Sequence, residues 1–147
     1  MTTTRYLAPA RGDRIFNALV GWFTRRGVSL AGSRVLAVRG RTSGEWRTTV
    51  LNVLTLDGER YLVAPRGHTQ WVRNLRAAGA GELRLGRRTE AFTAAELADD
   101  DKRPVLRAYL ERWAWEVGRF FEGIDPKHAT DDELAAVAPD FPAFRLT

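Results

Sequence analysis

The sequence of 147 residues contains no cysteine and only two histidines, and both shortages exclude classes of chemistry. Without cysteine, the chain can form no disulfide, no thiolate nucleophile and no cysteine-ligated metal site. His68 and His128 lie far apart in the sequence and lack the spacing that is typical of metal ligands. We therefore expect neither thiol chemistry nor a metal centre.

Long apolar runs are also absent. The first residues, MTTTRYLAPARGDR, lack the apolar core of a secretory signal, and no stretch approaches the length of a membrane span. The simplest expectation is a cytoplasmic protein. At this length the chain is predicted to form one domain over residues 1–147, large enough to bury a core of its own.

The charge is unevenly distributed along the chain, although its formal sum is only +5. Residues 34–88 hold eleven arginines and four acids, a net charge of +7, whereas residues 96–140 hold six basic and twelve acidic residues, a net charge of −6. This segregation suggests an anionic ligand on the cationic part. The alternative is two solvated faces of opposite sign. Lysine is scarce, two against twenty-one arginines, so arginine counts alone carry little weight.

A first helix is predicted over residues 13–26, where apolar side chains recur at helical spacing on one face. Asp13 is placed to cap its start and Gly27 to end it. We expect this helix to pack on the core of the domain. The less favoured alternative is an interfacial helix, with Trp22 and two terminal arginines at a membrane surface.

Five apolar runs predict strands, over residues 34–39, 47–56, 60–65, 81–86 and 87–97. Asp57-Gly58 is a strong hairpin signal between the second and third of these strands. A short helix is expected over residues 68–79, with Thr69 as its cap and Gly79 as its stop. The closing PAFRLT is a short strand that can rejoin the sheet.

The chain after the fifth strand is predicted to be mainly helical. Asp99–Asp101 stand near the start of a helix whose apolar face runs from Leu106 to Phe121. Thr130 and Glu133 form a capping box for a last helix, which Pro139 ends. Short strands joined mainly by hairpin turns predict a mainly β, α+β fold in which an antiparallel sheet closes into a small barrel. Neither a Gly-x-Gly-x-x-Gly nor a Walker motif is present.

The connection GRTSGEWR, residues 40–47, contains more glycine, arginine and hydroxyl residues than a hairpin turn requires. Gly40 and Gly44 let the backbone turn sharply and approach a ligand closely. Thr42 and Ser43 offer hydroxyl donors beside backbone N–H groups, a natural nest for phosphate oxygens. Arg41 and Arg47 add planar donors that suit phosphate or carboxylate. The alternative is a solvated, arginine-rich turn.

A second cluster, APRGHTQW, follows the third strand and again combines a glycine, Gly67, with an arginine, Arg66. The two loops could face one another across one groove. Further along, Trp71 and Leu75 are four residues apart on the predicted helix and are interpreted most simply as core. Asn74 is harder to explain as core, because a buried amide needs hydrogen-bond partners.

The stretches GRTSGEWRTTVL, YLVAPRGHTQWVRNL and GELRLGRRTEAFTAAEL resemble the family of deazaflavin-dependent nitroreductases and quinone reductases. The similarity covers about residues 34–97. It implies a split β-barrel that binds coenzyme F420, a deazaflavin with a phosphate and a tail of glutamates. The cofactor-binding residues that it implies are Arg41, Thr42, Ser43, Gly44, Arg47, Thr49, Ala64, Pro65, Arg66, Gly67, Trp71 and Asn74.

The resemblance also implies a reaction, hydride transfer from the reduced deazaflavin to a quinone, a nitroaromatic compound or an activated alkene. Thr42 replaces a lysine of the family pattern, and Pro65 and Arg66 replace a serine and a lysine. The tyrosines that line the family's substrate pocket are reduced here to Tyr109. This residue is a candidate proton donor, and the simpler interpretation is a core tyrosine.

Other functions remain open at this point. The same fold could serve a non-catalytic carrier of flavin, deazaflavin or haem, or an oxidase that uses FMN. The sequence pI of about 10.4 suggests nucleic-acid binding as a further hypothesis. Against it, the arginines are concentrated at the glycine-containing loops and do not form one stripe. We therefore expect a small-molecule hydride acceptor as the partner and no nucleic acid. A homodimer is an open alternative to a monomer.

Overall fold

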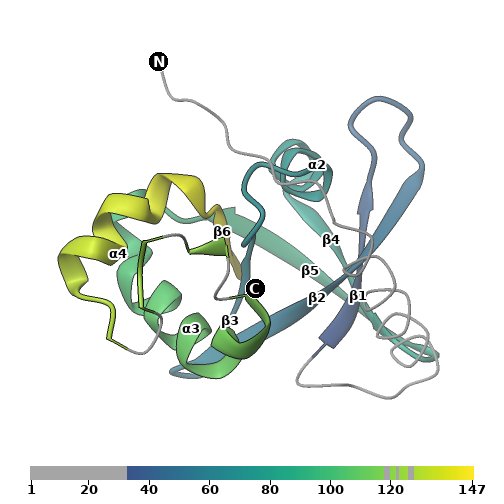
Figure 1. The fold of residues 1–147 in the computed structure, drawn as a ribbon. Coiled ribbons are helices and arrows are strands. Elements are labelled where there is room, and N and C mark those ends of the chain that lie inside the picture. Colours follow the sequence, from purple (N-terminus) through teal and green to yellow (C-terminus); the bar gives the residue numbers. More distant parts are fainter. Residues whose placement is uncertain (1–32, 118–119, 122, 126–127) are drawn as a thin grey trace.

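The computed structural model describes residues 33–117, 120–121, 123–125 and 128–147 (Figure 1). Six strands form a closed barrel in the order β1-β2-β3-β6-β5-β4, and every neighbouring pair is antiparallel. The strands are β1 (Ser33–Arg39), β2 (Trp46–Leu56), β3 (Glu59–Val63), β4 (Ala80–Leu85), β5 (Arg88–Glu96) and β6 (Ala143–Leu146). The predicted antiparallel barrel and the α+β class are confirmed.

The barrel closes at two places. The last strand, β6, inserts between β3 and β5, so that Phe144 lies opposite Leu62 on one side and Glu96 on the other. On the far side β1 pairs with β4, with Leu36 opposite Leu83. Closure removes the open sheet edges that would otherwise present unpaired backbone groups. The expectation that the closing residues rejoin the sheet is confirmed.

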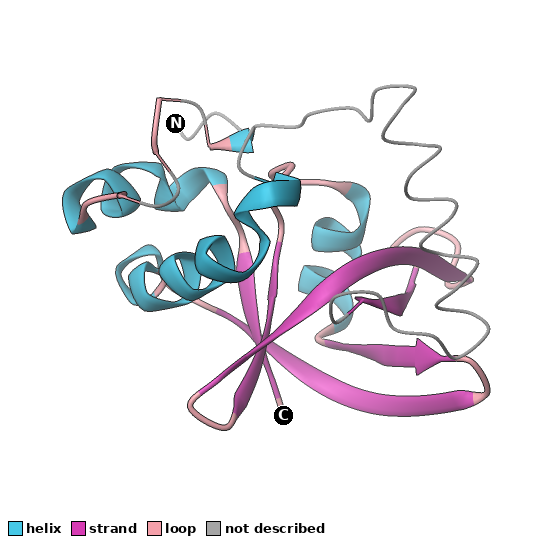
Figure 2. Cartoon of the chain, turned by 60° about the horizontal axis from the view of Figure 1, so that its bottom comes forward, coloured by secondary structure: helices cyan, strands magenta, loops and turns pink. Residues whose placement is uncertain are grey.

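The helices lie against the strands, as Figure 2 shows. They are α2 (Gln70–Ala78), α3 (Arg103–Val117) and α4 (Asp131–Val137), with 3₁₀ turns at η1 (Asp99–Asp101) and η3 (Ala138–Asp140). Within the residues that the structure describes, no helix has both the length and the apolar character needed to cross a membrane. The helix predicted over residues 13–26 lies outside the described residues.

The apolar interior consists of two clusters. The barrel cluster joins Leu36, Leu62 and Phe144 of the strands to Val72 and Leu75 of α2, so this helix is anchored directly in the barrel. The helical cluster lies under α3 and α4 and is built from Leu54, Val63, Val105, Leu106, Tyr109, Leu110, Trp113, Phe121, Ala129, Leu134, Ala138, Phe141 and Ala143. Because α2 belongs to the barrel cluster, its position is set by the strands.

Several local predictions are confirmed. Asp57 and Gly58 form the tight turn between β2 and β3, both with positive φ, as a two-residue hairpin of type I′ requires. The capping box holds, since Thr130 Oγ1 accepts from the N–H of Glu133 at 3.1 Å and the Glu133 carboxylate accepts from the N–H of Thr130 at 3.0 Å. Gly79 ends α2 as expected.

The predicted long helix needs correction at both ends. Asp99–Asp101 form the separate turn η1, and α3 begins at Arg103, just before Pro104, because proline fits the first turn of a helix but not its interior. At the other end, Trp113 has non-helical φ/ψ of −126° and 21°, and the helix stops at Val117.

Phe121 lies beyond the end of α3 but remains buried. Its ring stacks on the ring of Phe141 with centroids 3.9 Å apart and planes 6° apart. Tertiary packing of this ring against the residues before β6 therefore replaces the helical periodicity that the sequence indicated.

Gly81 in β4 provides a test of how closely the strands approach. A Cβ at this position would lie 2.8 Å from the Ala37 carbonyl oxygen and 3.0 Å from Phe92 Cζ. We expect Gly81→Ala to lower the free energy of unfolding by about 1–3 kcal/mol, because the overlap involves backbone. The control is Ala80→Ser, which also adds one heavy atom but on an exposed neighbour. Urea unfolding measures both, and equal effects would contradict the close approach.

Candidate functional site

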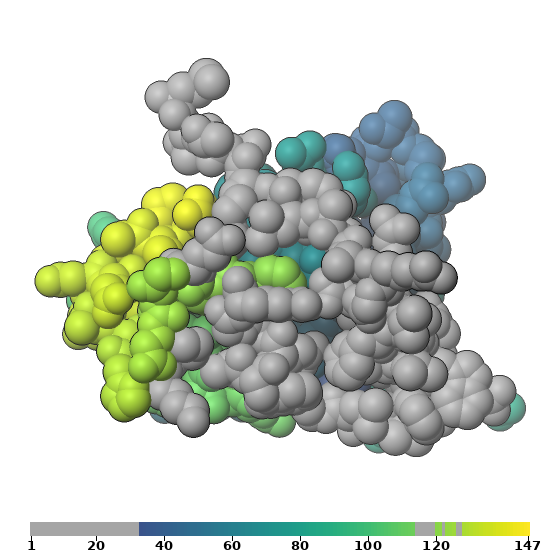
Figure 3. All heavy atoms as spheres, in the orientation of Figure 1, coloured from purple at the N-terminus to yellow at the C-terminus, as the bar shows by residue number. Residues whose placement is uncertain are grey.

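The loop between β1 and β2 is a folded structure that projects from the barrel beside α2 (Figures 1 and 3). The N–H of Gly40 donates to the carbonyl of Glu45 at 2.7 Å, and the N–H of Gly44 donates to the carbonyl of Gly40 at 2.9 Å. The N–H of Glu45 donates to Ser43 Oγ at 3.2 Å. Gly44 has φ of +74°, which lets the chain return to β2.

These internal bonds leave a defined set of donors at the apex of the loop. Between Gly40 and Glu45, only the N–H groups of Thr42 and Ser43 donate to no group in the described part of the chain. Both residues are exposed, and each carries a hydroxyl proton that is free to be donated outward. Two adjacent amides and two hydroxyls are suited to an anionic oxygen.

Arg41 is exposed, but its side chain lies against α2 and is hydrogen-bonded to it. Its N–H donates to Asn74 Oδ1 at 3.1 Å, and its Nη1 donates to the same oxygen at 2.8 Å. The same Nη1 also donates to Gln70 Oε1 at 2.9 Å. The loop is therefore tied to the first two turns of α2, across 33 residues of sequence.

The buried amide of Asn74 thus has an explanation. The side chain is only 6% exposed, and its oxygen accepts two hydrogen bonds from Arg41. Gln70, which the sequence did not single out, accepts a hydrogen bond from the same guanidinium. The available signal was its spacing, since residues four apart lie on the same face of a helix.

The second predicted loop, residues 64–67, faces the C-terminal part of the chain. The N–H of Ala64 donates to the carbonyl of Pro142 at 2.9 Å, and the N–H of Gly67 donates to the carbonyl of Ala64 at 3.2 Å. The guanidinium of Arg66 lies over the ring of Phe120, 4.7 Å from its centroid. Pro65 is half-buried. The contacts of this loop therefore run to the residues before β6 and to Phe120 beyond α3, whereas those of the first loop run to α2.

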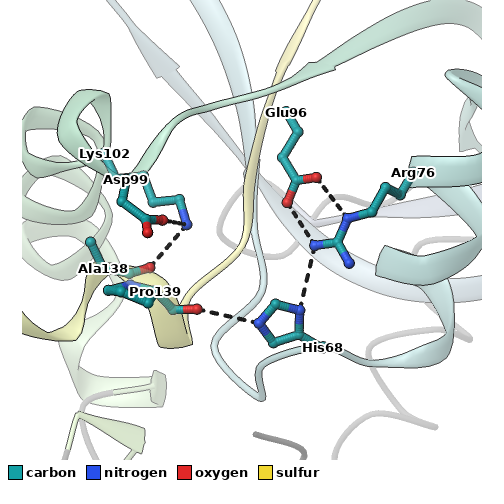
Figure 4. Close-up of polar contacts among 7 residues, drawn as sticks. All are labelled: His68, Arg76, Glu96, Asp99, Lys102, Ala138 and Pro139. Atoms are coloured by element: carbon teal, nitrogen blue, oxygen red, sulfur yellow. Dashed lines mark hydrogen bonds and ion pairs between the residues drawn. The ribbon is translucent and has the colours of Figure 1, made fainter. Parts of the chain in front are cut away.

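His68 links the start of α2 to this C-terminal part (Figure 4). Its Nδ1 lies 3.4 Å from Arg76 Nη2, and its Nε2 lies 3.3 Å from the carbonyl oxygen of Pro139. Because a guanidinium can only donate, Nδ1 is the acceptor and Nε2 carries the proton. Glu96 accepts two bonds of 2.7 Å from Arg76, and these bonds raise the pKa of the arginine.

Other sequence-predicted residues are more dispersed. Trp71 is half-buried, with its ring 6.0 Å from that of Phe144, and Thr49 is half-buried on β2. Arg47 is exposed and lies 4.0 Å from the Glu45 carboxylate. Thr69 is the N-cap residue of α2, but its hydroxyl makes no capping bond and is buried without a partner in the described structure.

Tyr109 lies in the helical cluster under α3, 3% exposed, with its ring 5.1 Å from that of Trp113. The loop that carries Arg41 is instead tied to α2, which packs on the barrel cluster. A proton-donor role for Tyr109 stays a prediction.

The outer face of the barrel carries arginine beside an exposed tryptophan. The guanidinium of Arg39 lies 4.1 Å from the ring centroid of Trp46, and that of Arg84 lies 5.2 Å from it. An open groove of about 570 Å³ begins here and continues past Gly81 and Phe92. The β1–β2 end of the barrel is therefore cationic, whereas acidic residues occupy η1 and the first turn of α4.

The structure is thus a small antiparallel barrel whose β1–β2 loop presents amide, hydroxyl and guanidinium donors. The profile of the F420H(2)-dependent quinone reductase family matches residues 14–119, more than half of the chain. The chain therefore belongs to this family. A comparison with curated proteins gave no match.

Several solved structures share the fold of this chain. One is described as an F420-H2 dependent reductase, FDR-A, with 17% identity, TM-score 0.55, and 79% of this chain and 94% of that chain covered. A second is described as a domain-swapped dimer, with 18% identity, TM-score 0.56, and 93% and 94% covered. A third, a heme binding protein from Mycobacterium smegmatis, has 14% identity, TM-score 0.53, and 95% and 52% covered. At such identities the likeness concerns the fold.

Gly44 tests whether the loop depends on its left-handed residue. An added Cβ would meet nothing within 4 Å, so a substitution acts through the backbone alone. We expect Gly44→Ala to lower the free energy of unfolding by about 1 kcal/mol. Gly44→Asn should cost less, because asparagine tolerates this conformation better. Urea unfolding of both variants measures the difference, and the reverse order would contradict the backbone assignment.

Proposed function

We propose that this protein is a reductase that uses reduced coenzyme F420 to deliver a hydride to a quinone, a nitroaromatic compound or an activated alkene. The observation that carries the proposal is the folded loop 40–45. Its exposed amides and hydroxyls and the guanidinium of Arg41 are held together on one side of α2. The family to which the chain belongs supplies the identity of the coenzyme.

The donor set fits the anionic half of that coenzyme. A phosphate needs several donors that converge on it, and a tail of glutamates needs a cationic surface nearby. We propose that Thr42, Ser43 and Arg41 provide the first. The second would come from Arg39 and Arg84, whose guanidinium groups lie near Trp46, and from Arg47, the next residue on β2. We propose that Arg47, Thr49 and residues 64–67 also line the path of the coenzyme.

The chemistry asked of the protein is limited to binding, orientation and shielding. When bound, the reduced deazaflavin supplies two electrons as a hydride, so no protein nucleophile is needed. Trp71 is a half-buried residue of α2, with its ring 6.0 Å from that of Phe144 on β6, and we propose that this ring is an aromatic surface for the deazaflavin. Orientation against such a rigid surface favours a reactive geometry.

The whole chain, residues 1–147, is proposed to act as one domain in the cytoplasm. A relative of similar fold is described as a domain-swapped dimer, which supports a homodimer as the assembly to test first. Light scattering during gel filtration distinguishes a dimer from a monomer. A haem-binding relative also suggests a carrier function. Both ring nitrogens of His68 have hydrogen-bond partners, which argues against this residue as a haem ligand.

Coenzyme binding can be followed by the quenching of tryptophan fluorescence on titration with oxidised coenzyme F420. We expect saturable binding, and we expect Arg41→Ala to weaken it about ten- to a hundredfold, because a hydrogen-bonded charged donor is lost. Arg73→Ala is the matched control, since it removes the same charge from an exposed position on α2. If both variants lost the same affinity for the coenzyme, the effect of Arg41 would be explained by net charge alone.

Turnover is tested by adding reduced coenzyme F420 and menadione to the wild-type protein. Oxidation of the coenzyme that depends on both protein and menadione would support the reductase. Tight binding without oxidation of any quinone, nitroaromatic or alkene acceptor would favour a carrier. A protein that is yellow as purified would favour FMN, and absence of coenzyme binding would overturn the proposal.

Tyr109→Phe tests the candidate proton donor. If Tyr109 donates the proton, kcat with menadione should fall about a hundredfold or more while the coenzyme still binds. If it is a core residue, kcat should stay within about twofold and the loss should appear only as a small change in unfolding free energy. Steady-state kinetics and urea unfolding of the same variant separate these outcomes.

A further inference from the structure

We propose that Asn74 and Gln70 are positioning residues, which hold Arg41 and its loop in place for an anionic ligand and do not themselves bind the coenzyme. This inference rests on the proposed function. It reassigns Asn74, for which the family resemblance implies a direct contact with the coenzyme. It also gives a role to Gln70, for which neither the sequence nor the family suggested one.

The hydrogen bonds between Arg41 and Asn74 all run from the arginine to the amide oxygen. Both groups that Arg41 presents to α2 are donors, so the atom of Asn74 that faces them is the carbonyl oxygen. One oxygen with two lone pairs accepts two bonds, 3.1 Å and 2.8 Å long, and its acceptor capacity is filled. A phosphate or an ionised carboxylate carries only acceptors and cannot bond to this oxygen, and the 6% exposure of Asn74 leaves its amide nitrogen little access to a ligand.

Asn74 is also buried. Asn74 is 6% exposed and lies beside Leu75 and Val72, which are fully buried in the barrel cluster. The helix that carries it is therefore fixed by the strands. A hydrogen bond from such a position transfers that rigidity to the loop, whose residues 41–45 are exposed and have few other attachments. Ordering the loop in advance lowers the entropy that ligand binding must otherwise cost.

The bonds to α2 occupy only one side of the Arg41 guanidinium. Nη1 is occupied by Asn74 and Gln70, and the backbone N–H of the same residue is occupied by Asn74. Nε and Nη2 have no partner among the described residues, and they form one edge of the planar group. An edge with two parallel donors matches two oxygens of a phosphate or a carboxylate. Holding Nη1 thus determines which edge the ligand meets.

Hydrogen exchange of the Arg41 backbone amide tests, without any coenzyme, whether Asn74 holds the loop in place. In Asn74→Leu, whose side chain fills similar volume but accepts no bond, exchange of the Arg41 amide should rise about tenfold. In Asn74→Asp, which keeps acceptor oxygens at the same place, protection should return to the wild-type level. Unchanged exchange in Asn74→Leu, or no rescue in Asn74→Asp, would overturn the proposal.

Coenzyme affinity tests whether the two residues act through Arg41. Gln70 is exposed, and its side chain bonds only to the Arg41 guanidinium within the described residues, so we expect Gln70→Leu to fold normally. Alone, it should weaken binding of coenzyme F420 about three- to tenfold. In the Arg41→Ala background it should have no effect, because the group that it holds is gone. A loss of the same size in both backgrounds would show direct contact and overturn the proposal.

Kinetics add a readout that general destabilisation would not produce. Asn74→Leu and Gln70→Leu should raise the KM for the coenzyme and leave kcat at saturating coenzyme within about twofold. A fall in kcat with KM unchanged would overturn the positioning role. If the wild-type protein binds no coenzyme F420, the proposed function fails by itself, and the exchange experiment still decides whether Asn74 holds the loop.

Discussion

The insertion of β6 between β3 and β5 is the interaction on which the rest of the structure depends. It closes the barrel from the last residues of the chain, and it brings the preceding turn η3 against the segment that leads into α2. The carbonyls of Pro139 and Pro142 then bond to His68 and to the N–H of Ala64. The start of α2 is thus fixed from the barrel below and from the C-terminal segment beside it.

This fixed helix connects the core to the candidate site. Apolar residues of α2 pack in the barrel cluster, while Asn74 and Gln70 reach the β1–β2 loop from the same helix. At its other end, Arg76 forms two bonds to Glu96 on β5. Ion pairs at such exposure contribute little stability individually. Their effect here is orientation, because they restrain the rotation of a helix that the core already holds.

The sequence was informative wherever the determining interaction was local. The turn at Asp57-Gly58 and the capping box at Thr130 depend on neighbouring residues, so their patterns predicted the observed structure. The barrel was predicted from the succession of short strands joined mainly by hairpin turns. The contact between Arg41 and Asn74 spans 33 residues and depends on where α2 packs, so the sequence could indicate only that Asn74 needed partners. The kink at Trp113 likewise arises from tertiary packing, which overrides helical periodicity.

The arrangement also explains how the loop could function with Thr42 where the family pattern has lysine. A lysine ammonium on a flexible stem adds attraction but must be ordered when the ligand binds. Here the cationic group next to it, Arg41, is ordered before any ligand arrives, with one nitrogen already bonded to α2. Thr42 contributes an amide and a hydroxyl whose positions follow from the turn itself. Affinity would then come from a few donors held in place, and a long mobile side chain would not be needed.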